Sequence, residues 1–115
     1  MEDNLDLPSD KGEIQQISSA LQAISHPTRL KILCFLGDQE KIVNEILEYA
    51  GSTQSNISQH LEVLRNAGVI QSRRVHNKVY CSVQTAEMRP LIAKIKELFC
   101  SQQVAAEHGV FSLIQ

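Results

Sequence analysis

Apolar residues recur near the start of the chain with the spacing of an amphipathic helix. They follow one another at intervals of three, four and three residues, so they fall on one stripe of a helix that begins near Gly12. The residues of this stripe are Ile14, Ile17, Leu21 and Ile24. The pattern therefore predicts a first helix with one face available for packing.

A second helix is expected directly after the first. Ser25-His26-Pro27 interrupts the first helix, and Pro27 suits the first turn of the next, because that turn does not need its N–H. The apolar residues that follow point nearly all round the helix axis: Leu30, Ile32, Leu33, Phe35 and Leu36. Such a pattern is typical of a helix buried at the centre of a small domain.

Two shorter helices with a glycine-containing turn between them come next. The first is expected over about residues 42–49 and the second over 53–66, where the hydroxyl of Thr53 can cap the helix start. This length of turn is that of a helix-turn-helix motif. The second helix of the pair is then the expected recognition helix.

A β-hairpin and a long last helix complete the pattern. Val79, Cys81 and Val83 alternate strictly after His76-Asn77, which predicts a hairpin with a tight turn. The last helix is expected over about residues 85–103. Its apolar face consists of Met88, Leu91, Ile92, Ile95, Leu98 and Phe99.

The order of these elements predicts the fold class. A helix-turn-helix followed by a hairpin is a winged helix, so the chain is expected to be mainly α with a small β-hairpin. The apolar stripes of the first and last helices exceed what one small domain can cover, so a homodimer through both helices is expected. The boundaries are a mobile acidic tail over 1–12, a winged-helix DNA-binding and dimerisation domain over 13–103, and a C-terminal tail over 104–115.

Length and composition narrow the class of protein. With 115 residues, 43% of them hydrophobic, the chain has room for one compact domain and none for a multidomain enzyme. Its apolar runs fall far short of the roughly 18 to 20 residues that span a bilayer. Residues 1–10 are acidic and lack the apolar stretch of a secretory leader. A cytoplasmic location without a membrane partner is expected.

The net charge of −2 conceals an uneven distribution. Residues 1–13 hold five acidic side chains and one lysine, whereas residues 53–78 hold four basic side chains and one glutamate. A polyanion needs a basic surface rather than a basic protein, and a dimer would present this segment twice. The distribution favours nucleic-acid binding by the helix-turn-helix and the hairpin.

Eight side chains in that segment are candidates for contacting DNA. Hydroxyl and amide groups on the polar face of helix 53–66 suit the reading of base edges in the major groove. Basic residues of the hairpin suit the phosphate backbone or the minor groove, and they also protect an edge strand from pairing. His60 lies at the edge of the polar face, where it either touches phosphate or packs. The candidates are Gln54, Ser55, Ser58, Gln59, His60, Arg73, Arg74 and Lys78.

The three cysteines have different surroundings in the sequence. Their spacing matches neither a disulfide framework nor a zinc finger. Cys81 alternates with valines and is expected to be a small buried hydrophobe. Cys34 sits among apolar residues, so packing alone can explain it. Cys100 projects about 140° away from Ile95, near the centre of its helix's apolar stripe, so core filling does not explain it.

Three segments resemble the ArsR family of dimeric winged-helix repressors. They are SHPTRLKIL at 25–33, TQSNISQHL at 53–61 and LRNAGVI at 64–70, and the resemblance extends over about residues 14–102. It implies a repressor that binds a palindromic double-stranded DNA operator as a homodimer. It also implies that the chain is not an enzyme, and no nucleophile, base and orienting group occur at useful spacing.

The family's metal sites are not matched in this sequence. Ile42 and Asn44 stand where the arsenic and cadmium type has a Cys-x-Cys pair, and helix 85–103 contains no histidine for the pairs that bind zinc, cobalt or nickel. Apolar and amide side chains cannot supply thiolate to a soft ion. No metal site and no cofactor are therefore expected.

Cys34 and Cys100 instead resemble the dithiol of the HlyU, BigR and SqrR branch of the family, which senses reactive sulfur species or oxidants. The resemblance implies that a disulfide or polysulfide bridge between these thiols releases the operator. One alternative is that the cysteine thiolates hold a soft ion such as As(III) or Cd(II). Another is a protein-interaction module that never touches DNA.

Overall fold

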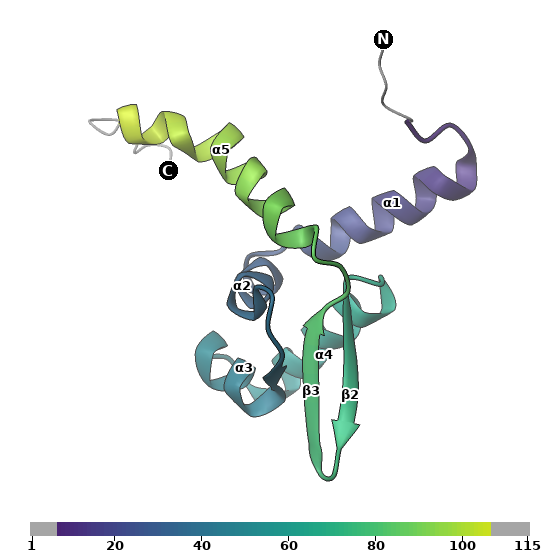
Figure 1. Ribbon diagram of the computed structural model, residues 1–115, viewed down its shortest axis with the longest axis vertical. Helices are drawn as coiled ribbons and strands as arrows, with labels where there is room; N and C mark the ends of the chain where they lie inside the picture. The colour runs from purple at the N-terminus through teal and green to yellow at the C-terminus, as the bar shows by residue number, and fades with distance from the viewer. Residues whose placement is uncertain (1–6, 107–115) are drawn as a thin grey trace. The chain divides into compact units, whose positions relative to one another are not determined.

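Five helices and three strands make up residues 7–106, the part of the chain that this computed structural model describes (Figure 1). Contacts divide the chain into two compact units, one up to Gln84 and one from Thr85. The first unit contains α1 (Lys11–Ile24), α2 (Pro27–Leu36), β1 (Lys41–Ile42), α3 (Val43–Ala50), α4 (Gln54–Asn66), β2 (Ile70–Val75) and β3 (Lys78–Val83). The second contains α5 (Met88–Ala106).

Helix α1 begins earlier than the expected domain boundary. The carboxylate of Asp10 accepts a hydrogen bond from the backbone N–H of Glu13 at 2.8 Å, and this cap starts the helix at Lys11. The last two residues of the segment 1–12 are therefore helical. Residues 1–6 and 107–115 of the two expected tails lie outside the described residues.

The expected starts of α2 and α4 are confirmed, and each has a side-chain cap. Nδ1 of His26 accepts a hydrogen bond from the N–H of Thr28 at 3.1 Å, with Pro27 as the first residue of the helix. Oγ1 of Thr53 accepts one from the N–H of Asn56 at 3.1 Å. Both caps satisfy N–H groups that have no partner inside the helix.

The wing is a three-stranded antiparallel sheet in the order β1-β3-β2. Strands β2 and β3 form the expected hairpin, in which Ser72 lies opposite Cys81 and Arg73 opposite Tyr80. The third strand, β1, was not expected, because two residues are too few to show an alternating pattern. It pairs with β3 through Ile42 and Tyr80, and α3 follows at the next residue.

The core lies among α2, α3, α4 and the inner face of the hairpin. Its fully buried members include Ile32, Leu33, Leu36, Ile46, Ile57, Leu64, Ile70 and Cys81. The burial of Cys81 confirms its interpretation as a small hydrophobe.

The prediction that α2 is buried on all sides is wrong. Residues 32, 33 and 36 face the core, which turns Leu30 and Cys34 to the opposite side of the helix. Leu30 is 39% exposed and Cys34 is exposed as well. Packing within the chain therefore does not explain Cys34.

The first and last helices keep most of their apolar stripes exposed in the described structure. On α1 the exposed side chains are Ile14, Ile17 and Leu21. On α5 they are Leu91, Ile95, Leu98 and Phe99. Among the described residues, no helix combines the length and the apolar character that crossing a bilayer requires.

An aromatic pair joins α2 to α3 on the surface. The rings of Phe35 and Tyr49 stack with centroids 4.2 Å apart and an angle of 11° between their planes. Nζ of Lys31 lies 5.3 Å from the Tyr49 centroid, and Nζ of Lys41 lies 4.9 Å from that of Phe35. The pair thus has a cation over each ring, an arrangement that favours both contacts.

Candidate nucleic-acid interface

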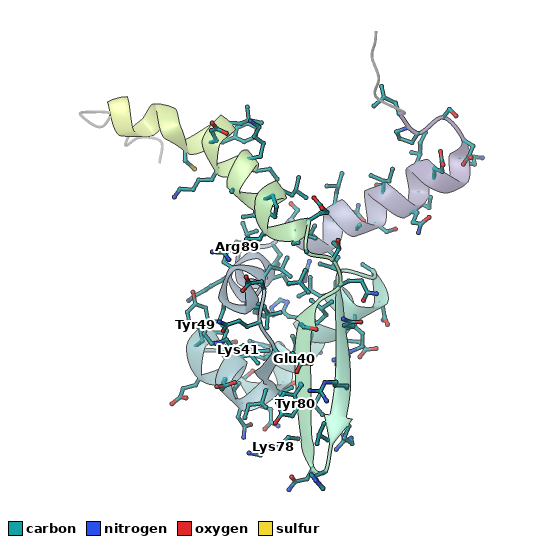
Figure 2. All side chains as sticks on the ribbon, viewed as in Figure 1. Glu40, Lys41, Tyr49, Lys78, Tyr80 and Arg89 are labelled. Atoms are coloured by element: carbon teal, nitrogen blue, oxygen red, sulfur yellow. The ribbon has the colours of Figure 1, made fainter. Side chains whose placement is uncertain are left out.

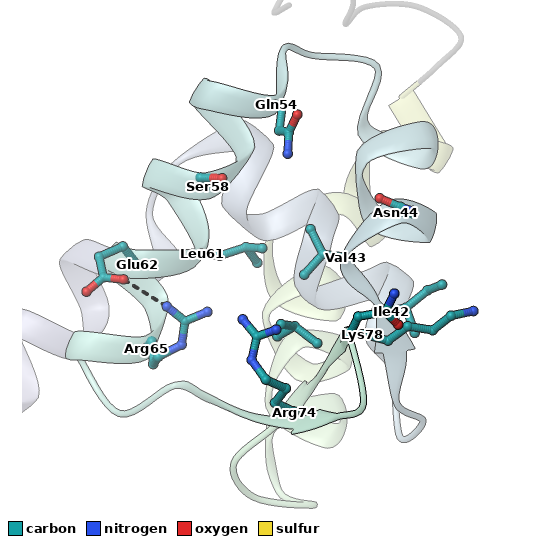
Figure 3. Close-up of a pocket in the computed structure, with 12 residues that line it drawn as sticks. Ile42, Val43, Asn44, Gln54, Ser58, Leu61, Glu62, Arg65, Arg74 and Lys78 are labelled. Atoms are coloured by element: carbon teal, nitrogen blue, oxygen red, sulfur yellow. Dashed lines mark hydrogen bonds and ion pairs between the residues drawn. The ribbon is translucent and has the colours of Figure 1, made fainter.

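A groove of about 470 Å³ runs between the start of α3, one face of α4 and the wing (Figure 3). The α3 wall includes Val43 and Asn44. The α4 wall includes Gln54, Ser58, Leu61, Glu62 and Arg65, and the wing contributes Arg74 and Lys78. Hydroxyl, amide and guanidinium groups from three elements therefore face one space.

Helix α4 has a buried apolar side and an exposed side that carries amide and hydroxyl groups. Ile57, Leu61 and Leu64 are buried, whereas the four amide and hydroxyl candidates of this helix are exposed and His60 is half-buried. Gln54 and Ser58 line the groove. Ser55 and Gln59 are exposed on the same helix but do not line it. The groove and the exposed face together give hydrogen-bonding groups along the N-terminal half of α4.

Arg65 is part of the groove, although it is not among the eight residues that the sequence pattern indicates. Its Nε donates a hydrogen bond to Oγ of Ser72 at 2.9 Å, and its Nη1 lies 2.8 Å from Oε1 of Glu62. The first contact ties α4 to β2. A signal was present in the sequence, since Glu62 and Arg65 have the i, i+3 spacing of a helical ion pair.

Two neighbouring arginines of β2 point in opposite directions. Arg74 lies opposite Val79 and reaches from the wing toward α4 in the groove (Figure 3). Arg73 faces the other side of the sheet, since successive side chains of a strand alternate. The structure therefore brings Arg74 and Lys78 to the groove with α4, and it leaves Arg73 outside.

Arg73 is bound to Glu40, the residue before β1. Its Nε and Nη2 donate to the two carboxylate oxygens at 2.7 and 2.8 Å, and its guanidinium carbon lies 5.1 Å from the centroid of Tyr80. The hydrogen bond from Arg73 holds the pKa of Glu40 below its ordinary value, and the same bond raises the pKa of Arg73.

His60 is also directed away from the groove. Its Nδ1 lies 3.2 Å from Nη1 of Arg29, and its ring centroid lies 4.5 Å from that of His26. Burial, followed by the charges of His26 and Arg29, lowers the pKa of His60 below its ordinary value. Nε of the same Arg29 donates to the carbonyl of Ala23 at 2.6 Å. His60 therefore belongs to the junction of α1, α2 and α4.

The three thiols differ in accessibility. Cys34 on α2 and Cys100 on α5 are exposed, and they belong to different compact units. Cys81 is buried in β3, and this burial raises the pKa of its thiol. Nucleophilic sulfur chemistry requires an accessible thiolate. Exposure thus distinguishes Cys34 and Cys100 from Cys81.

Comparison with known proteins agrees with the family resemblance found in the sequence. The family described as "Bacterial regulatory protein, arsR family" matches residues 26–72. The biofilm growth-associated repressor of Xylella fastidiosa is 31% identical over 91 residues, which cover 79% of this chain and 80% of that protein.

Solved structures agree with this match. HlyU from Vibrio cholerae superposes with a TM-score of 0.69 and 30% identity, covering 79% of this chain and 99% of that one. The transcriptional repressor BigR from Xylella fastidiosa superposes with a TM-score of 0.68 and 29% identity, covering 78% of this chain and 92% of that one. The family match over residues 26–72 includes the α3 and α4 walls of the groove and ends before Arg74 and Lys78 of the wing.

Proposed function

The chain belongs to the ArsR family of bacterial transcriptional regulators, and on that premise we propose that it is a dimeric repressor whose operator is released when Cys34 and Cys100 are oxidised. The observation that carries DNA binding is the groove, in which polar side chains of α4 face basic side chains of the wing. In this proposal α4 enters the major groove and the wing follows the phosphate backbone.

The residues proposed to contact DNA fall into two groups. Gln54, Ser55, Ser58 and Gln59 offer amide and hydroxyl groups to base edges, and glutamine can pair bidentately with adenine. Arg74 and Lys78 offer positive charge to phosphates. His60 and Arg73, which the sequence pattern also selected, are engaged elsewhere and are left out of this set.

Homodimerisation is proposed through the exposed apolar faces of α1 and α5. Ile14 and Leu21 are 51% and 55% exposed on α1, and Leu98 is 61% exposed on α5. Exposed apolar stripes of this kind are typical of an interface between proteins. A two-fold dimer presents two copies of α4, which fits a palindromic operator with half-sites about 34 Å apart.

The sensing step is proposed as thiol oxidation by a persulfide or a peroxide. A thiolate attacks the outer sulfur of a persulfide RSSH and releases RSH, which leaves Cys–SSH. The second thiol then attacks the inner sulfur of Cys–SSH and expels H₂S, which leaves a disulfide. With hydrogen peroxide the intermediate is a sulfenic acid, and water leaves in the second step. The exposure of both thiols supports this assignment.

One experiment tests the redox proposal directly. The reduced full-length protein is treated with a glutathione persulfide donor or with hydrogen peroxide, and thiol products are identified by mass spectrometry while duplex affinity is measured in parallel. Treatment is expected to bridge Cys34 to Cys100 and to weaken binding. Cys34→Ser and Cys100→Ser are expected to keep their affinity after treatment. If both variants still lose DNA, the dithiol mechanism is wrong.

Metal titration and duplex-binding measurements on the same reduced protein distinguish the alternative functions. If As(III) or Cd(II) added to the reduced chain produces thiolate-to-metal absorption and releases DNA, the soft-ion alternative replaces the redox proposal. If the chain shifts no palindromic duplex at any salt concentration, a protein-interaction module replaces the repressor. A salt-dependent shift supports the repressor.

A further inference from the structure

Arg73 binds Glu40, which is labelled beside Tyr80 in Figure 2, and this contact spans the whole wing. Arg73 is in β2, at one edge of the sheet, and Glu40 immediately precedes β1, at the other edge. The guanidinium passes over Tyr80 of β3, the central strand. The pair therefore connects the two edge strands across the strand that separates them.

This connection joins two walls of the DNA-binding groove. Strand β1 continues directly into α3, whose first residues Val43 and Asn44 form one wall. Strand β2 carries Arg74, which forms part of the wing wall. The pairing of β1 and β2 with β3 sets the spacing of these walls, and the Glu40–Arg73 pair adds a direct side-chain link between the two edges.

The geometry of the Glu40–Arg73 pair fixes the orientation of the two side chains more than it stabilises the folded protein. A single exposed ion pair contributes little to folding, but a bidentate contact permits only a narrow range of orientations. Stacking over Tyr80 restricts the guanidinium further. The donor fork of Nε and Nη2, which could otherwise grip a phosphate, is occupied by the carboxylate.

We propose that Glu40 and Arg73 are positioning residues, which hold the wing against α3 so that Arg74 is aimed into the groove, and that Arg73 does not itself contact DNA. This inference rests on the proposed function of the groove. It assigns a role in DNA binding to an acidic residue, Glu40, whose charge alone would oppose DNA.

The unfavourable effect of the Glu40 charge on DNA binding provides a test of the positioning role. Glu40→Gln removes a negative charge near a polyanion, so electrostatics alone would raise DNA affinity. Loss of the bidentate contact is instead expected to lower affinity by about fivefold. The probe is a fluorescent duplex that the full-length protein selects from a random-sequence pool. Glu48→Gln is the matched control, because it makes the same charge change at an exposed position at the other end of α3. This variant is expected to bind the duplex no more weakly than the parent protein does.

Two more variants distinguish positioning from phosphate contact. Arg73→Lys keeps the charge but cannot form the fork, so it is expected to lose as much affinity as Glu40→Gln. The Glu40→Gln/Arg73→Gln double variant is expected to lose no more than either single variant. The dependence of log affinity on log salt is expected to keep the parent slope in Arg73→Gln, whereas loss of a phosphate contact reduces it by about one.

Specific results would contradict the positioning role of Glu40 and Arg73. Unchanged or tighter binding by Glu40→Gln overturns the positioning role, and a reduced salt slope in Arg73→Gln overturns it by making Arg73 a phosphate contact. Thermal unfolding of each variant excludes a general loss of structure, and Arg73→Lys decides the question if Glu40→Gln does not fold. Absence of duplex binding by the parent protein would instead contradict the proposed function itself.

Discussion

Nη1 of Arg29 lies 3.2 Å from Nδ1 of His60, so α2 holds the recognition helix from the side opposite the groove. A guanidinium can only donate hydrogen bonds. Nδ1 of His60 must therefore accept, which places the proton of the neutral ring on Nε2. Protonation of Nδ1 would remove the acceptor and put a second positive charge beside Arg29.

The burial of His60, together with the charges of His26 and Arg29, predicts a pH dependence of stability. The folded-state pKa of His60 is lower than its unfolded value, so the unfolded state binds the proton more tightly. The free energy of unfolding is expected to be highest above about pH 6.5 and to fall as the pH drops through the lower folded-state pKa. Urea unfolding across this range measures the effect.

His60→Asn keeps a hydrogen-bond acceptor near Nδ1 but cannot titrate. Its free energy of unfolding is expected to depend less steeply on pH than that of the parent. His76→Asn, which removes an exposed imidazole in the hairpin turn, is the matched control. Parallel pH profiles for the parent and His60→Asn would show that the junction of α1, α2 and α4 does not sense protons.

Removal of the cap of α4 is expected to weaken both stability and DNA binding. Thr53→Ala deletes the acceptor for the N–H of Asn56 and should lower the free energy of unfolding by about 1 kcal/mol. The N-terminal turn that carries Gln54 would fray, so duplex affinity should fall with it. Thr53→Ser retains the hydroxyl and should restore most of both quantities.

Arg74→Gln is expected to remove one phosphate contact. The slope of log affinity against log salt should decrease by about one, with a loss of affinity that is greatest at low salt. Lys11→Gln, at the start of α1, makes the same charge change away from the groove and should leave the slope unaltered. An unchanged slope for Arg74→Gln would remove Arg74 from the interface.

The thiols are expected to react in two classes. In the native reduced protein near neutral pH, iodoacetamide should alkylate Cys34 and Cys100 well before Cys81, since burial hides the Cys81 sulfur and raises its pKa. Mass spectrometry of peptides after timed labelling measures the order. Labelling in denaturant should make all three equivalent, and early native labelling of Cys81 would contradict the described burial.

The sequence predicts most of the fold, because its signals are local. Pro27 and Thr53 mark helix starts through their own backbone and side-chain chemistry, and Val79, Cys81 and Val83 alternate within one strand. These features depend on neighbouring residues only. For the same reason the polar face of α4 could be recognised from helical spacing alone.

The directions of individual basic side chains could not be predicted in this way. Arg73 and Arg74 look equivalent in the sequence, and only the partner strand shows which one faces the groove. Glu40 lies 33 positions from Arg73, so no local pattern links them. His60 likewise finds Arg29 through packing of α2 on α4. Contacts distant in sequence are set by tertiary structure.

The aromatic rings that lie beneath cations include both tyrosines of the chain, and their placement has a spectroscopic consequence. The chain contains two tyrosines and no tryptophan, so its strongest ultraviolet emission comes from Tyr49 and Tyr80. Tyr49 stacks on Phe35 beneath Lys31, whereas Tyr80 lies beneath Arg73. Tyr49→Phe would leave Tyr80 as a single intrinsic fluorophore in the wing, and Tyr80→Phe would leave one at the surface where α2 meets α3. Motions of either region could then be followed without attaching a dye.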